Sequence, residues 1–449
     1  MLRTVRCRSV LLWSLLVLCV VQSSFAAESR PQRLVSPELL KHAHLKIVWE
    51  NELPIRKTER LERLRILGNR LYAISDRNYT TSMNRENGNI IFGRTIAPPG
   101  VPIAGLKLYG DLLIYAGGSR LVEIDVASGL EGKTIDVGFG IVCPAARNSS
   151  YFYLSGADGR LHVLRAADRV RMFEVAPENN SMITSIVADD AFVIFATDAG
   201  NVISFTPDRP KRLWQFDAAD AIAAPIVLDQ MFLCTAELQF QNTLDSGIIT
   251  EGLRQKFEES DRLLSQDARV SIEQAGSEWR ITDNLKRYSV RKGPGSLYIY
   301  DGMSLFLASK DTNVYRIDIA GLPERRRLVW KYQTDGLLEQ APRVTQQVVY
   351  QHVPGKGMTA IDKKSGLFLW TVPGGLDLLA EARGRAYVMT KNETLVVMDN
   401  VSAKKLYSVN FAGVSQQAAN IADSKIYIAD NRGRIACLQP VEQSIVVSE

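Results

Sequence analysis

Four aspartates have the clearest potential for chemistry, because each ends an apolar run at a similar place in a repeated pattern. A ring of carboxylates could bind a calcium ion or act as a general base. An aspartate that starts a turn instead accepts hydrogen bonds from the backbone N–H groups that follow it, which explains the shared position. We therefore interpret all four as turn residues and predict no catalytic residue. They are Asp125, Asp318, Asp362 and Asp399.

Histidine and cysteine are too few and too scattered to predict a metal centre or a nucleophilic site. Two of the four histidines, His42 and His44, are close in sequence but precede the first predicted strand. The cysteines beyond residue 26 are widely spaced and form neither a CxxC pair nor a zinc spacing, so we expect buried thiols. We predict no metal and no bound cofactor. These cysteines are Cys143, Cys234 and Cys437.

The stretch over residues 355–371 (GKGMTAIDKKSGLFLWT) shows the element that carries these residues. Two short β-rich runs flank a Lys/Ser/Gly turn, which is typical of a hairpin. Variants occur at residues 83–92, 121–135, 314–330 and 395–407. Recurrence of one hairpin along most of the chain predicts a repeat architecture.

A large residue on the last strand of each unit marks the repeat. Six of the seven intervals between neighbouring markers are about 40 residues, the length of a four-stranded propeller blade. The eight markers predict an all-β fold, an eight-bladed β-propeller of four-stranded antiparallel blades over residues 45–440. Aromatic markers could stack on a flat ligand, but we interpret them as wedges between blades. The markers are Trp49, Phe92, Ile135, Phe173, Trp214, Trp330, Trp370 and Tyr407.

The two ends of the repeat region complement each other. Residues 421–438 supply strand-like runs without a marker strand, whereas residues 45–50 supply a marker strand alone. Joining them completes the last blade and removes the exposed sheet edges of an open array. We therefore predict that the N-terminal strand closes the ring.

One interval, between Trp214 and Trp330, is longer than the others by roughly 75 residues. We predict a partly helical insertion at about residues 240–295, with an amphipathic helix over residues 251–268. Residues 222–238 and residues 297–309 both look like a first and second strand, and which pair is an extra hairpin stays open. The insertion either docks a partner or covers the ring. The candidate partner-binding residues are Leu253, Phe257, Leu264, Trp279, Tyr288 and Arg287.

The first 26 residues have the pattern of a signal peptide: a basic start, an apolar run at residues 10–21 and a small-residue cleavage site. The apolar run is too short for a permanent span. Cys19 raises lipidation as an alternative, although Leu18 is bulky for such a site. We expect residues 27–44 to be a tether with a short helical turn from residue 37, and residues 441–449 to be a C-terminal tail.

Charge excludes some partners. The formal net charge is +5, and removal of the three leader arginines leaves about +2. A value so small predicts neither nucleic acid nor an anionic membrane as the main partner.

The repeat resembles that of pyrroloquinoline quinone (PQQ) enzymes, most clearly over residues 361–370 (IDKKSGLFLW) and residues 124–129 (IDVASG). One branch of that family is the PQQ-dependent alcohol dehydrogenases. Membership of that branch would imply a bound quinone, a calcium ion, an adjacent cysteine pair and a catalytic aspartate. This chain has no adjacent cysteine pair and is short for that branch. The other branch is non-enzymatic and includes assembly factor B, a periplasmic scaffold of the outer-membrane β-barrel assembly machinery.

Together these features favour an exported, non-catalytic propeller that binds protein as a scaffold in the cell envelope. We expect a periplasmic, envelope-associated or secreted monomer without a membrane span after signal cleavage. A PQQ-dependent oxidoreductase is the first alternative, and a glycan-binding propeller is the second.

Overall fold

The computed structural model describes residues 33–237, 271–275, 278–282, 287–293, 296–319 and 326–441, with the backbone alone between residues 230 and 302. Several predicted features lie outside this part of the chain: the signal peptide at residues 1–26, the tail from residue 442, and the helix at residues 251–268 with Leu253, Phe257 and Leu264.

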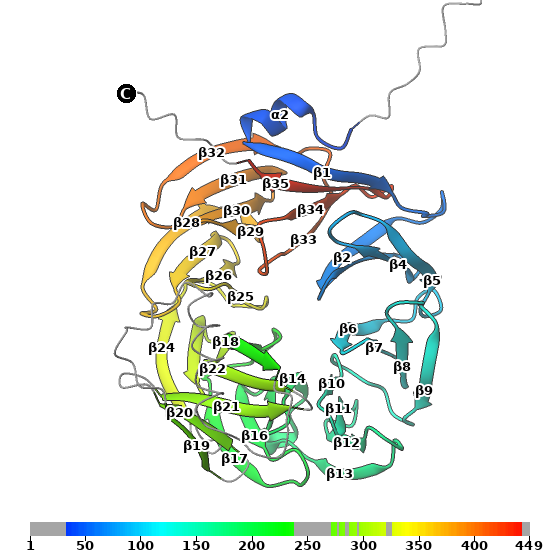
Figure 1. The fold of residues 1–449 in the computed structure, drawn as a ribbon, viewed down its shortest axis with the longest axis vertical. Helices are drawn as coiled ribbons and strands as arrows, with labels where there is room; N and C mark the ends of the chain where they lie inside the picture. Colours follow the sequence, from blue (N-terminus) through cyan, green and yellow to red (C-terminus); the bar gives the residue numbers. More distant parts are fainter. Residues whose placement is uncertain are drawn as a thin grey trace, which may run out of the picture.

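The strands form eight antiparallel sheets arranged as a ring (Figure 1). Seven sheets have four strands and the eighth has seven. The predicted eight-bladed propeller is therefore confirmed. All eight marker residues lie on the fourth strand of a blade.

The first four blades follow the chain in order. Blade 1 contains β2 (Leu61–Leu67), β3 (Arg70–Ser75), β4 (Tyr79–Asn84) and β5 (Ile90–Thr95). Blade 2 contains β6 (Ile103–Tyr109), β7 (Leu112–Gly117), β8 (Arg120–Asp125) and β9 (Glu131–Asp136). Blade 3 contains β10 (Ala146–Arg147), β11 (Tyr151–Ser155), β12 (Leu161–Arg165) and β13 (Arg171–Val175). Blade 4 contains β14 (Ile183–Ala188), β15 (Val193–Thr197), β16 (Asn201–Phe205) and β17 (Arg212–Asp217).

The remaining blades complete the ring. Blade 5 contains β18 (Val227–Glu237), β22 (Ser296–Ala308), β23 (Asn313–Asp318) and β24 (Arg327–Gln333). Blade 6 contains β25 (Arg343–Val344), β26 (Val348–Val353), β27 (Gly357–Asp362) and β28 (Phe368–Pro373). Blade 7 contains β29 (Gly375–Ala382), β30 (Arg385–Thr390), β31 (Thr394–Asp399) and β32 (Lys405–Asn410). Blade 8 contains β33 (Gln416–Ala418), β34 (Ile426–Ala429), β35 (Arg434–Pro440) and β1 (Leu45–Glu52).

Blade 8 confirms the predicted closure, because β1 pairs with β35 from Leu45 opposite Pro440 to Glu52 opposite Arg434. The core lies between blades. Middle strands such as β15 and β16 are buried on both faces, whereas the outer strand β1 alternates buried and exposed residues. This difference follows from position, since a middle strand packs against a blade on each side.

Blade 5 corrects the sequence prediction of an extra first-and-second-strand hairpin. Neither stretch is such a hairpin, because β18 and β22 are single long strands that pair with each other from Val227 opposite Phe306 to Glu237 opposite Ser296. Two strands within residues 297–309 would need a turn near Asp301 and Gly302, but the chain there has a register shift between the pairs Gln230–Met303 and Phe232–Tyr300. A bulge and a turn have similar residue preferences, so the sequence alone did not separate them.

The described part of the insertion is β-structure, which the sequence analysis did not predict. A meander of β19 (Ser271–Ala275), β20 (Glu278–Thr282) and β21 (Arg287–Gly293) pairs onto the first half of β22.

The segment before β1 packs against the ring. A short helix, α2 (Pro37–His42), forms where a helical turn was predicted, and the Ser36 hydroxyl accepts a hydrogen bond from the Leu39 N–H at 3.3 Å. Leu34, Leu40 and Ala43 are buried among residues of blades 7 and 8. The predicted tether is thus part of the folded core from residue 34 onward. A 3-10 turn, η1 (Glu178–Asn180), precedes β14.

Within the described ranges, no helix combines the length and the hydropathy that crossing a bilayer would need.

Candidate functional site

The insertion forms a sheet that extends blade 5 beyond the ring. Its strands are β19, β20 and β21, together with the halves of β18 and β22 that lie beyond the Gln230–Met303 pair. We call these five strands the blade 5 extension. In a propeller blade the ends of the first and third strands point to the same face of the ring. The extension therefore stands on the face that carries the first-to-second and third-to-fourth strand turns.

The register divides the extension into two faces. Trp279 is opposite Val290, Ile281 is opposite Tyr288, and Val290 is opposite Ile299. Residues that pair across strands share a face, and neighbours along a strand alternate between faces. These five positions therefore share one apolar face.

The opposite face is polar on β20 and β21, where it carries the positions of Glu278, Arg280, Arg287, Ser289 and Arg291. On β22 the same face carries the positions of Tyr298 and Tyr300. Of the predicted partner-binding residues, the structure thus places Trp279 and Tyr288 on one face and Arg287 on the other.

The aspartates hold turns, as expected, in three of the four blades concerned. Asp125 accepts hydrogen bonds from the Ser128 N–H at 2.7 Å and the Ser128 hydroxyl at 2.6 Å. Asp362 and Asp399 make the same contacts with the serine three residues on. Asp318 instead accepts from the Ser304 hydroxyl at 2.7 Å and from Arg316.

These turn hydrogen bonds also lower the pKa values of Asp125 and Asp399. The side-chain hydrogen bond from Ser128, followed by the backbone bond, lowers the pKa of Asp125 below its usual range. The backbone and side-chain bonds from Ser402 do the same for the pKa of Asp399. A carboxylate whose acceptor sites are occupied and whose pKa is low is poorly suited to act as a general base.

The marker tryptophans pack between blades. Trp330 lies against Gly366 of the next blade, where an added Cβ would come within 2.6 Å of the indole. Its N–H donates to the Lys363 carbonyl oxygen at 3.0 Å, and the Trp370 N–H donates to the Asn400 side-chain oxygen at 3.1 Å. Trp49, Trp214, Trp330 and Trp370 are each at most 9% exposed, so their ring faces are not available to a stacked ligand.

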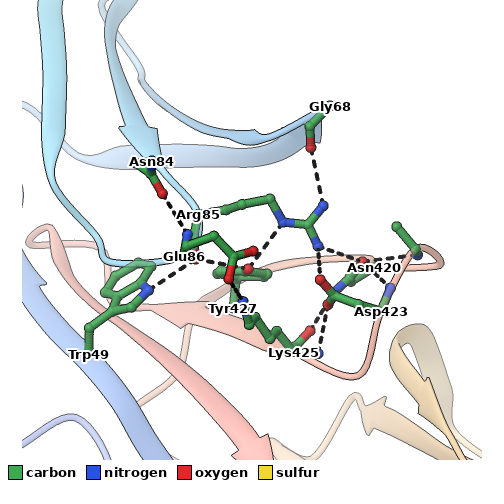
Figure 2. Close-up of polar contacts among 10 residues, drawn as sticks. Trp49, Gly68, Asn84, Arg85, Glu86, Asn420, Asp423, Lys425 and Tyr427 are labelled. Atoms are coloured by element: carbon green, nitrogen blue, oxygen red, sulfur yellow. Dashed lines mark hydrogen bonds and ion pairs between the residues drawn. The ribbon is translucent and has the colours of Figure 1, made fainter. Parts of the chain in front are cut away.

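Figure 2 shows the seam at which blade 8 meets blade 1. The Arg85 guanidinium donates to the Tyr427 hydroxyl at 3.2 Å, to the Gly68 carbonyl at 3.1 Å and to Asp423 at 2.7 Å. It also donates to the Asn420 side chain at 3.3 Å. We call this cluster the closing clasp. Because it joins the first and last blades, it supplements the strand pairing that closes the ring.

A buried histidine cluster was missed by the sequence analysis. His162 is 2% exposed, its Nε2 lies 3.0 Å from Asp158, and its Nδ1 lies 3.2 Å from Glu174. Its ring stacks on Phe139 at 3.9 Å. Each carboxylate contacts a different nitrogen of the His162 ring, so the two do not converge on one cation. No group of three potential metal ligands was found in the described ranges. The signal that could have located the cluster is the strand pairing of His162 with Glu174.

The cysteines behave as predicted where they are described. Cys143 and Cys437 are free and buried. Burial raises the pKa of each thiol to about 12. Cys234 lies on β18, where only the backbone is described.

Comparison with known proteins supports the repeat and the fold. The family model described as "Outer membrane protein assembly factor BamB" matches residues 266–442. The crystal structure of BamB from Moraxella catarrhalis aligns with a TM-score of 0.52 and 10% identity, over 90% of this chain and 99% of that chain. The computationally designed Ika8 protein aligns with a TM-score of 0.52 and 10% identity, over 86% and 98% of the two chains.

At such identities these structures establish a likeness of fold alone. No curated protein matches this chain. The chain is an eight-bladed β-propeller of PQQ-like repeats, and over residues 266–442 it is similar to the BamB family.

Proposed function

We propose that the chain is a non-catalytic, exported propeller that holds a protein partner in the cell envelope, with the blade 5 extension as its docking surface. The observation that carries the proposal is the extension itself. Seven blades complete the ring with four short strands, whereas blade 5 continues both of its first two strands outward and adds three more.

The connection to the ring supports a docking role. Strands β18 and β22 run from the core of blade 5 into the extension. Buried residues of the core, such as Leu305 and Leu307, therefore fix the position of the outer sheet. Sites on strands of a rigid scaffold hold their geometry better than sites on loops. The face that carries the positions of Trp279, Tyr288 and Val290 has the aromatic and aliphatic residue types that anchor protein interfaces.

The similarity to the BamB family supports the same class of function, since the matched protein is described as an outer membrane protein assembly factor. Export is supported by the leader pattern at residues 1–26.

The test removes the extension without opening the ring. Gln230 and Met303 are the last paired residues before the register shift, so an Asn-Gly turn joining them replaces residues 231–302 with a two-residue hairpin. Envelopes are cross-linked and solubilised, and proteins bound to the full chain and to this hairpin-closed variant are compared by mass spectrometry. The proposal expects one partner that the full chain retains and the folded variant loses.

The same preparations test catalysis. We expect no bound-quinone spectrum and no dye-linked alcohol oxidation after addition of PQQ and calcium. A stoichiometric quinone spectrum with alcohol-dependent turnover would replace the scaffold proposal with an oxidoreductase.

A further inference from the structure

A cavity of about 780 Å³ lies between blades 7 and 8. Its size is within the range of ordinary ligand pockets. The lining comes from the β29–β30 turn and Tyr387 of blade 7, from Ser424 and the end of β35 in blade 8, and from Lys46 on β1.

The cavity exists because of how the ring closes. In blades 1, 2 and 6 a Gly-containing turn joins the third and fourth strands and packs on the marker of the preceding blade, as Gly366 does on Trp330. In blade 8 the chain leaves at Val441 and enters at His44, so that turn is missing. The marker of blade 7, Tyr407, donates a hydrogen bond to the Ala43 carbonyl at 2.9 Å instead. The start of β1 and the end of β35 therefore take the place of a compact turn.

Among the described residues of the lining, cations outnumber acids. Lys46, Arg383 and Arg385 line the cavity, and Lys46 and Arg383 are solvent-exposed. Across the described ranges, Lys46 and Arg385 form no salt bridge. A partly enclosed site with several cations raises the local concentration of anions.

The nearby acids are occupied by other contacts. Glu381 is the acid among the lining residues that the structure describes, and its Oε2 accepts hydrogen bonds from the Tyr350 hydroxyl at 2.6 Å and the Thr345 hydroxyl at 2.7 Å, both on blade 6. Asp399 interacts electrostatically with Arg385, but its carboxylate is hydrogen-bonded within its own turn.

We infer that this cavity binds carboxylate groups of an acidic peptide segment, and that it is a second docking point for the protein partner of the ring. The inference rests on the proposed function in taking the ligand to be a protein segment. Position supports it, because the β29–β30 turn is a first-to-second strand turn and so lies on the same face as the blade 5 extension. In the ring only blade 6 separates blade 5, which carries the extension, from blade 7, as Figure 1 shows. A partner that lies over this face reaches both surfaces.

The test measures binding of a fluorescein-labelled hexaglutamate peptide to the full chain by anisotropy at low salt. Lys46→Gln with Arg385→Gln removes two cations of the cavity. Arg327→Gln with Lys331→Gln removes two exposed cations from β24 of blade 5 and is the charge-matched control. We expect saturable binding that weakens at least about tenfold in the first double variant and is unchanged in the control, since a charge-assisted hydrogen bond contributes about one decade in affinity.

Equal weakening in both double variants, or no binding by the full chain, would overturn the inference. Displacement of the peptide by inorganic phosphate at micromolar concentration would also overturn it, in favour of a small-anion site. A hexaglutamine peptide is expected not to bind. The hairpin-closed variant, which lacks the blade 5 extension, should bind hexaglutamate normally, so a failure of the docking proposal is distinguishable from a failure of this one.

Discussion

The indole N–H of Trp49 donates a hydrogen bond to the carbonyl oxygen of Arg85 at 3.1 Å, across the seam between the last and the first blade. The Trp330 indole makes the equivalent bond to Lys363 between blades 5 and 6. The closing seam therefore uses the same contact as a seam in mid-chain, and it adds the guanidinium contacts of Arg85 (Figure 2).

Arg85→Ala should destabilise the fold by about 3 kcal/mol, because the change leaves partly buried polar partners of the closing clasp without a donor. Arg85 is 6% exposed, so solvent compensates little for the loss. Urea unfolding monitored by tryptophan fluorescence measures the change. Arg432→Ala, at an exposed arginine of blade 8, is the control and should stay within about 0.5 kcal/mol of the parent. Equal stability of the Arg85 variant and the control would show that the clasp does not hold the ring.

Gly366→Ala should be costlier than Gly355→Ala. Both glycines have a left-handed φ, +74° and +80°, so both substitutions incur backbone strain of roughly 1 kcal/mol. An added Cβ at Gly366 also meets the Trp330 ring at 2.6 Å, whereas at Gly355 it meets nothing within 4 Å. Overpacking should add about 1–3 kcal/mol at Gly366 alone. Thermal unfolding of the two variants gives the difference, and identical values would mean that the indole does not pack on this turn.

Stability should fall as the pH rises above about 9. The pKa of each buried thiol, Cys143 and Cys437, is raised from 9.0 to about 12 by burial. Between those values the folded chain keeps protons that the unfolded chain releases, so unfolding becomes more favourable with increasing pH. Urea unfolding at pH 8, 9 and 10 measures the slope. A variant with both cysteines replaced by alanine should show a shallower slope, and an unchanged slope would contradict the assignment.

Repeat spacing was enough to predict the ring, because each blade packs an aromatic or apolar marker at one fixed strand position. Trp49 also indicated how the ring closes, since its strand had no partners nearby in sequence. Blade 5 was harder to predict. Asp301 and Gly302 have turn-like chemistry, yet they lie within a continuous strand whose path is set by pairing with β18.

Contacts between strands explain the other features that the sequence analysis did not predict. His162 and Glu174 are twelve positions apart and meet only through the register of β12 and β13. The cavity between blades 7 and 8 involves Lys46 and Arg385, which are distant in the chain and are brought together by ring closure. Local sequence patterns contain no information on such pairs until the register and the blade order are known.

The most direct test of the docking proposal compares the two faces of the blade 5 extension. Trp279→Ser with Tyr288→Ser alters the apolar face, and Arg280→Ser with Ser289→Ala alters the polar face of the same strands. Cross-linked envelopes are analysed for the partner that the full chain retains. Loss of at least about tenfold in the apolar-face variant, with retention in the polar-face variant, is the predicted result, since aromatic anchors carry most of the free energy at protein interfaces. Retention of the partner by the folded apolar-face variant would contradict the proposed docking surface.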